Sequence, residues 1–170
     1  QSDTYMRVAR VGASIEMNMQ LRTEETLDGN LLSINTLTMM GKQPMGMKAS
    51  VVGDVIRVQM DQGGREMVYD FPFPPNAVSV WGMMRESLIQ GFEPGTTYSV
   101  LLYSPDMSMQ APIKTDVSVG NKEQIDYYGE ILELTRVDMS MRAGALGEVN
   151  TVSWVDGSGR IIKTEVSMGG

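Results

Sequence analysis

The chain has 170 residues, the usual size of one domain, and its 14 basic and 21 acidic side chains give a formal net charge of −7. Because phosphates need lysine and arginine to neutralise them, this charge disfavours nucleic acid and anionic membranes as partners. Cysteine and histidine are both absent, which excludes disulfides, thiolate or imidazole metal sites and histidine-dependent catalysis within this chain.

The sequence also bears on location. No stretch approaches the roughly 20 apolar residues that span a bilayer, so we expect no membrane span. The polar residues 2–4 after Gln1 resemble the short lead that follows a removed signal or anchor. We therefore expect an extracytoplasmic protein, either periplasmic or secreted.

Alternation of apolar and polar residues, with turn signals between the runs, predicts antiparallel strands. It is clearest over residues 14–23 and returns over residues 45–51 and 56–60. A long run over residues 107–119 shows the same period, and a last strand is expected over residues 160–166. One-sided alternation is typical of an antiparallel sheet with one face in water.

A helix of about three turns is predicted over residues 80–90, where the period changes. The three prolines of residues 72–75 rule out a central strand before it, and Gly91 stands where a helix C-terminus favours glycine. The apolar residues at i, i+3 and i+7 of this helix are Trp81, Met84 and Leu88.

These elements predict a mainly β fold: a curved antiparallel sheet, or half-barrel, of about ten strands with the one α-helix across its concave face. We expect residues 1–170 to form a single β-domain, either a whole protein or the N-terminal part of a longer one. An incomplete barrel leaves an open sheet edge, so self-association or a following domain is an expected kind of partner.

Three segments carry a family resemblance: EETLDG over residues 24–29, LIQGFEPGTTYSV over residues 88–100 and WVDGSGRIIKTE over residues 154–165. In their order they resemble the β-domain found ahead of the catalytic domain in bacterial transglutaminase-like proteins. The resemblance implies an extracytoplasmic location and a sheet similar to the half-barrels of periplasmic lipoprotein carriers, which enclose apolar ligands. It implies no activity here, because the Cys-His-Asp chemistry of those enzymes would lie in a following domain.

Sixteen methionines are the most unusual feature of the composition, and several are spaced i, i+2 so that each pair shares one face of a strand. Methionine is unbranched and polarizable, and it fills irregular cores or lines adaptable apolar cavities. A half-barrel would turn such residues inward, where they could hold an acyl chain or an apolar peptide segment, unless the helix fills the concavity. The candidate residues are Met17, Met19, Met45, Met47, Trp81, Met84, Leu88, Met107 and Met109.

The leading hypothesis is a non-catalytic extracytoplasmic binding or accessory domain, with no catalytic residue, no cofactor and no metal of its own. One alternative is soft-metal binding, Cu(I) or Ag(I), through the Met-x-Met pairs, since thioethers are soft ligands. Another is an accessory fragment of a transglutaminase-like enzyme. Residues 156–159 have the composition of a cation loop but are better explained as a hairpin turn, and Trp81 and Trp154 are expected to anchor the core.

Overall fold

The backbone is described, in a computed structural model, for residues 2–10, 13–40, 43–62, 64–105, 107–142, 144 and 147–169. Side chains are described for residues 18–39, 44–61, 64–105, 107–142, 144 and 147–167. Contacts group the chain into two compact units, Gln1–Asn76 and Ala77–Gly170, and each is described by itself. A single β-domain over residues 1–170 stays a prediction.

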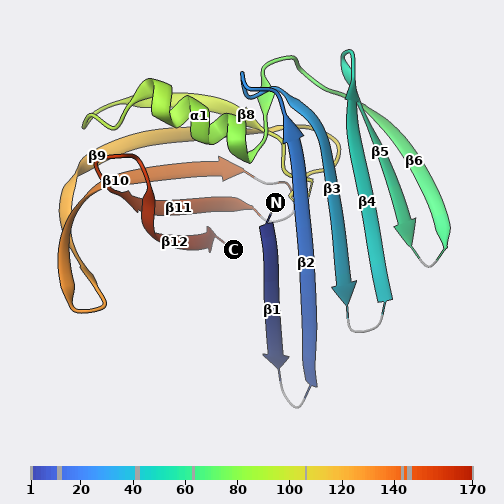
Figure 1. The fold of residues 1–170 in the computed structure, drawn as a ribbon, viewed down its shortest axis with the longest axis horizontal. Coiled ribbons are helices and arrows are strands. Elements are labelled where there is room, and N and C mark those ends of the chain that lie inside the picture. Colours follow the sequence, from blue (N-terminus) through green and yellow to red (C-terminus); the bar gives the residue numbers. More distant parts are fainter. Residues whose placement is uncertain are drawn as a thin grey trace. The chain divides into compact units, whose positions relative to one another are not determined.

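The first unit is a six-stranded antiparallel sheet whose strands lie side by side in chain order (Figure 1). The strands predicted over residues 14–23, 45–51 and 56–60 are confirmed. The proline that ends the last strand is tolerated because that strand is an edge of the sheet, where a missing N–H is least costly. The strands are β1 (Ser2–Arg10), β2 (Ala13–Glu25), β3 (Leu31–Met40), β4 (Gln43–Val52), β5 (Val55–Gln62) and β6 (Arg65–Pro72).

The second unit is a curved six-stranded sheet in the order β12-β11-β10-β9-β8-β7, with one helix packed on one of its faces (Figure 1). Its pairs are antiparallel except for β7 and β8, which run parallel. The elements are β7 (Ala77–Val78), α1 (Val80–Gln90), β8 (Thr97–Leu102), β9 (Ile113–Tyr127), β10 (Glu130–Arg142), β11 (Glu148–Val155) and β12 (Ile161–Gly169).

The mainly β, antiparallel class with a single helix is therefore confirmed in the described part of the chain. The described residues form twelve strands rather than about ten, divided between two sheets. The strand predicted over residues 160–166 is confirmed as β12.

The core of the second unit lies on the sheet face that α1 covers. Along the first half of β9, every second residue from Ile113 to Val119 is buried and the residues between them are exposed. One cluster joins buried residues of β8 to β11 with Met83 of the helix, and another joins Val117, Val137 and Val155 with Phe92 and Met139 packed against them. The apolar face of the alternation pattern is therefore the face that packs.

The helix is confirmed at Val80–Gln90, and Gly91 follows it with a φ of 79°, a conformation that favours glycine. Its rotation about its own axis differs from the prediction. Gly82 is buried and Met83 packs on the sheet, whereas Trp81 is 45% exposed. Trp81 as a core anchor is thus wrong, whereas Trp154 is buried as predicted, 6% exposed, on the sheet face opposite the helix.

Hydrogen bonds explain this rotation. The Tyr98 hydroxyl donates to Ser87 Oγ at 2.8 Å, and Ser87 Oγ donates to the Met83 carbonyl at 3.0 Å. Because Met83 and Ser87 are four residues apart, they lie on the same side of the helix. That side therefore faces β8, and burying Gly82 beside it lets the helix backbone approach the sheet.

The strand predicted over residues 107–119 is wrong for its first part, because β9 begins only at Ile113. Turn chemistry overrides the alternation there. Ser108 Oγ donates to the Ala111 carbonyl at 2.8 Å, and Pro112 has no N–H for a strand ladder. Tyr103, 1% exposed, donates its hydroxyl to the Met109 carbonyl at 3.1 Å. Met107 and Met109 accordingly lie in a loop that is hydrogen-bonded to the buried Tyr103.

The Tyr103 contact predicts a pH dependence of stability. Burial raises the pKa of Tyr103 from 10.0 to about 12, so the folded state keeps its proton where the unfolded state loses it. The higher pKa in the folded state adds to the free energy of unfolding. This contribution is fully present below pH 10 and is lost as the pH rises to about 12. Urea unfolding at pH 9 to 12 measures this loss.

The variant Tyr103→Phe is the control for this titration. It removes the bond to Met109 and should cost about 1 kcal/mol at neutral pH, but its stability should fall less between pH 10 and 12 than that of the unaltered chain. Equal slopes in the two proteins would contradict the assignment.

A close approach at the β11–β12 turn gives a second prediction. Gly159 has a φ of 80°, and a Cβ there would lie 2.5 Å from Phe92 Cε2 and 3.0 Å from Leu88 Cδ2. We expect Gly159→Ala to lower the free energy of unfolding by at least about 1 kcal/mol. In the same turn, a Cβ added at Gly157 would have no atom within 4 Å, so Gly157→Ala should change stability by less than about 0.5 kcal/mol. Similar losses in thermal or urea unfolding would show that the contact is absent.

Candidate functional site

An apolar groove of about 300 Å³ lies within the second unit, between α1 and strands β10 to β12. The helix contributes residues spaced by four, which share one side of a helix, and the strands contribute residues of the packed sheet face. The apolar residues that line the groove are Val80, Met83, Met84, Leu88, Phe92, Val137, Met139, Val155 and Ile161.

The strand register explains why these residues face one another. Val137 lies opposite Ser153, and Val155 lies opposite Ile161 across a bulge between β11 and β12. Ser153 is small, which leaves space on this part of the face, whereas Phe92 and Leu88 pack closely against Gly159. The Ser153 hydroxyl shares a hydrogen bond of 3.2 Å with Thr164 Oγ1, which satisfies this polar atom of the mainly apolar lining.

One charged residue, Arg160, lines the groove. Its Nε donates to Asp156 Oδ2 at 3.1 Å. Hydrogen bonds from the Ser158 side chain and from the N–H groups of Arg160 and Ser158 lower the pKa of Asp156 to about 2. This carboxylate therefore closes the β11–β12 turn, which confirms the hairpin turn predicted for residues 156–159.

The predicted site residues are distributed over several elements. Met84 and Leu88 line the groove, whereas Trp81, on the same helix, does not. Met19, Met45 and Met47 lie on β2 and β4 of the first unit, Met107 and Met109 lie in the loop before β9, and the Met17 side chain lies outside the described residues. One inward surface formed by all nine residues stays a prediction.

The sequence reasoning missed the sheet side of the groove. Val137, Val155 and Ile161 belong to runs that alternate, so their sharing of an apolar face was predictable from the period. Which strands lie beneath the helix depends on strand order, and alternation carries no information about that order. Met139 stood out in the sequence only as a member of a Met-x-Met pair.

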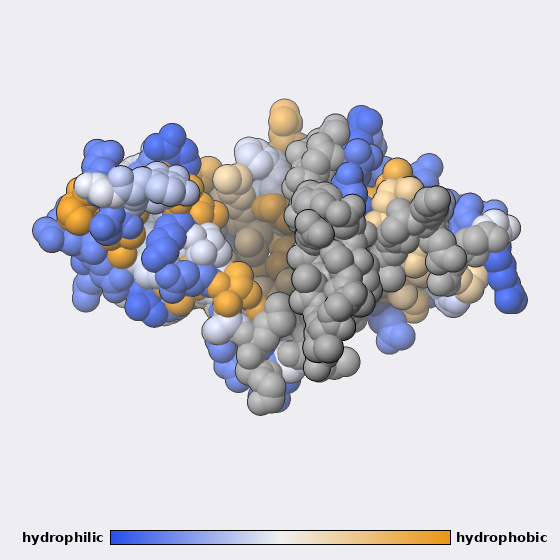
Figure 2. All heavy atoms as spheres, turned by 90° about the horizontal axis from the view of Figure 1, so that it is seen from below, coloured by the Kyte–Doolittle hydropathy of each residue, from blue (hydrophilic) through white to orange (hydrophobic). Residues whose placement is uncertain are grey.

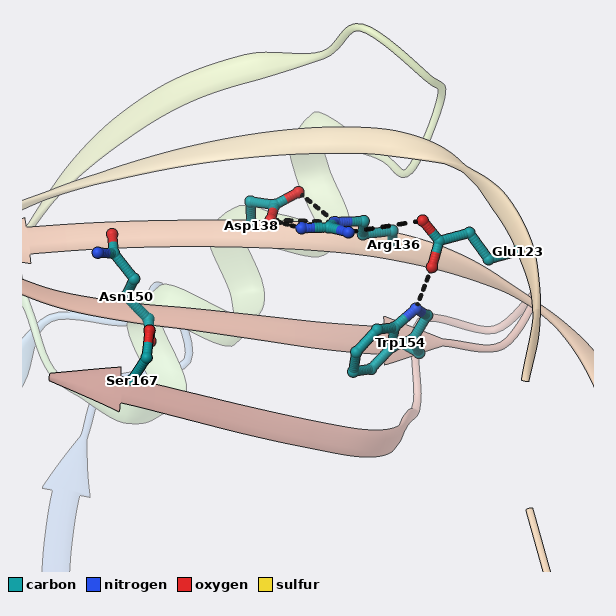
Figure 3. A network of polar contacts seen from close by, with 6 residues as sticks. All are labelled: Glu123, Arg136, Asp138, Asn150, Trp154 and Ser167. Carbon is teal, nitrogen blue, oxygen red and sulfur yellow. Dashed lines mark hydrogen bonds and ion pairs between the residues drawn. The ribbon is translucent and has the colours of Figure 1, made fainter. Parts of the chain in front are cut away.

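The opposite face of the same sheet is polar, with a shallow hollow of about 690 Å³ over β8 to β11. Arg136 pairs with Asp138 at 2.7 Å and with Glu123 at 3.6 Å, and Trp154 Nε1 donates to Glu123 at 2.8 Å (Figure 3). The hydrogen bonds to Asp138 raise the pKa of Arg136, so the guanidinium stays charged. The charged groups of this network are paired with one another, which favours a structural role for it.

Two further features bear on function. Within the described residues, no three acidic side chains come together in a way that could hold a metal ion. In that same part of the chain, no helix combines the length and apolar character needed to cross a bilayer.

Comparison with solved structures finds a similarity in fold. No protein-family model and no curated protein matches the chain. Its structure is similar to that of the beta-barrel-like protein of domain of unknown function DUF1849 from Brucella abortus, with a TM-score of 0.63 and 13% identity over 92% of this chain and 69% of that one. At this identity the likeness shows the fold alone, and it confirms the predicted mainly β half-barrel class.

Proposed function

We propose that this chain is a non-catalytic binding domain that holds an apolar ligand, such as an acyl chain or an apolar peptide segment, in the groove between α1 and β10 to β12. The observation that carries the proposal is that the helix does not fill the groove. Met84 and Leu88 line it and are nevertheless 45% and 51% exposed. Leaving this apolar surface in water is unfavourable, and a ligand that covers it gains that free energy.

The size and chemistry of the groove support this role. Its volume of about 300 Å³ is at the lower end of the range for small-molecule sites. The polarizable thioethers of Met83, Met84 and Met139 adapt to ligands of different shapes. Arg160 at the lining, held by Asp156 through its Nε, has further guanidinium N–H groups that could donate to a polar head group. A carrier-like domain outside the cytoplasm, as the family resemblance implies, is part of the proposal.

A non-catalytic role rests on the residue types available. The chain has neither cysteine nor histidine, and the groove lining offers hydroxyls and one arginine beside its apolar side chains. An accessory role beside a following domain is compatible with the same groove, since an apolar peptide segment could occupy it.

Ligand binding is tested with uncharged 1-alkanols from hexanol to octanol, titrated into the whole chain by calorimetry. Each added methylene buried in the groove is worth about 0.8 kcal/mol, so the affinity should rise roughly fourfold per carbon. We expect Met84→Lys to weaken binding of octanol at least about tenfold, because a lysine at the lining places its charge against an apolar ligand.

The matched control is Ile89→Lys, on the same helix. Ile89 is 60% exposed and does not line the groove, so the same change in charge should leave the affinity for octanol unaltered. An affinity independent of chain length, or an equal loss in both variants, would overturn the proposal.

A further inference from the structure

A second group of side chains lies in the first unit, away from the groove. The strand register places Met47 directly opposite Met60, and Met60 directly opposite Met67, across three neighbouring strands. Directly opposite residues share a sheet face and have Cβ atoms about 4.5–5.5 Å apart. Three thioethers therefore form one row across β4, β5 and β6.

Two more methionines share this face. Met45 lies two residues before Met47 on β4, and Thr38 lies between Met45 and Met19 in the next row. Figure 2 shows moderately hydrophobic residues, in pale orange, at the surface of the part that carries these strands. The methionine face is defined as Met19, Met45, Met47, Met60 and Met67.

The residues of the methionine face are not among the fully buried core side chains. Among the described side chains of the first unit, the buried apolar ones are Leu31, Ile34, Ala49, Ile56, Val58 and Phe73, with no methionine. The five methionines are all partly exposed. The methionine face therefore continues the sheet face that carries the buried Ile34, Ala49 and Val58, at positions that stay partly exposed and that an ion from solvent can reach.

The chemistry of the row suits a soft ion. Thioethers are neutral, soft donors that favour Cu(I) and Ag(I), and this chain has no cysteine or histidine to compete for such an ion. The Met67 sulfur accepts one weak hydrogen bond, from the Tyr69 hydroxyl at 3.5 Å. Asp61 and Glu66 are the next pair along β5 and β6 after Met60 and Met67. Because neighbouring residues of a strand point to opposite faces, these carboxylates lie on the face away from the methionines.

We propose that Met47, Met60 and Met67 bind one Cu(I) or Ag(I) ion, with Met45 as an additional donor. This site is independent of the apolar groove, because it lies on other strands of the other unit. Thioether ligands have no proton to lose, so the affinity of this site for the ion should not depend on pH. Sites made of carboxylates or imidazoles, in contrast, bind metal more weakly as the pH falls.

The test titrates the whole chain with Ag(I), and with Cu(I) against a competing chelator without oxygen. Methionine methyl groups labelled with ¹³C report which sulfurs bind. We expect one ion per chain, shifts at the methyl groups of Met47, Met60 and Met67, and the same affinity at pH 5.5 and 7.5. Loss of even an outer-shell partner weakens metal binding roughly 10–100-fold, so Met60→Leu should weaken it at least about tenfold.

The matched control is Met39→Leu. Met39 pairs with Asn18 and Pro44 in the register of the opposite face of the same sheet, so this change should leave the affinity unaltered. Leucine conserves the volume of methionine, and Met47→Leu and Met67→Leu repeat the test if Met60→Leu lowers stability. Binding weaker than about millimolar, an unaltered affinity in all three row variants, or an affinity that falls at pH 5.5 would overturn the proposal.

Discussion

The contact between the Met83–Ser87 side of α1 and strand β8 determines the arrangement of the second unit. Tyr98 holds Ser87 by a hydrogen bond, and Met83 enters the cluster formed by Leu102, Ile113 and their neighbours. Because this side of the helix is occupied, the row of Val80, Met84 and Leu88 is turned toward β10 to β12. The groove is therefore a direct result of how the helix is rotated on the sheet.

The two faces of that sheet differ in polarity. The face beneath α1 is apolar, and its few hydroxyls are satisfied within the chain. The other face carries ion pairs such as Lys114 with Asp116 and Arg136 with Asp138, which are exposed and contribute little to stability individually. The apolar groove, and with it the proposed ligand binding, is consequently confined to one face, while the other face stays in contact with water.

Local pattern predicted the elements well, and its failures have local or tertiary causes. The helix at Val80–Gln90 followed from a change of period and a terminal glycine, both of which act within a few residues. Trp81 was misplaced because the rotation of the helix depends on Gly82 and on Tyr98 of another element. The early strand start was wrong because Ser108 and Pro112 favour a turn. The methionine row could not be predicted, since register relates strands that spacing within one strand does not connect.

The strand order of the first unit also bears on how it folds. Each of its strands pairs with the next one along the chain, through connections of a few residues. Such pairing gives a low contact order, so little chain entropy is lost before each hairpin gains its hydrogen bonds. A meander of this kind can grow hairpin by hairpin, and its folding rate should be closer to that of proteins rich in local contacts than to that of Greek-key sandwiches.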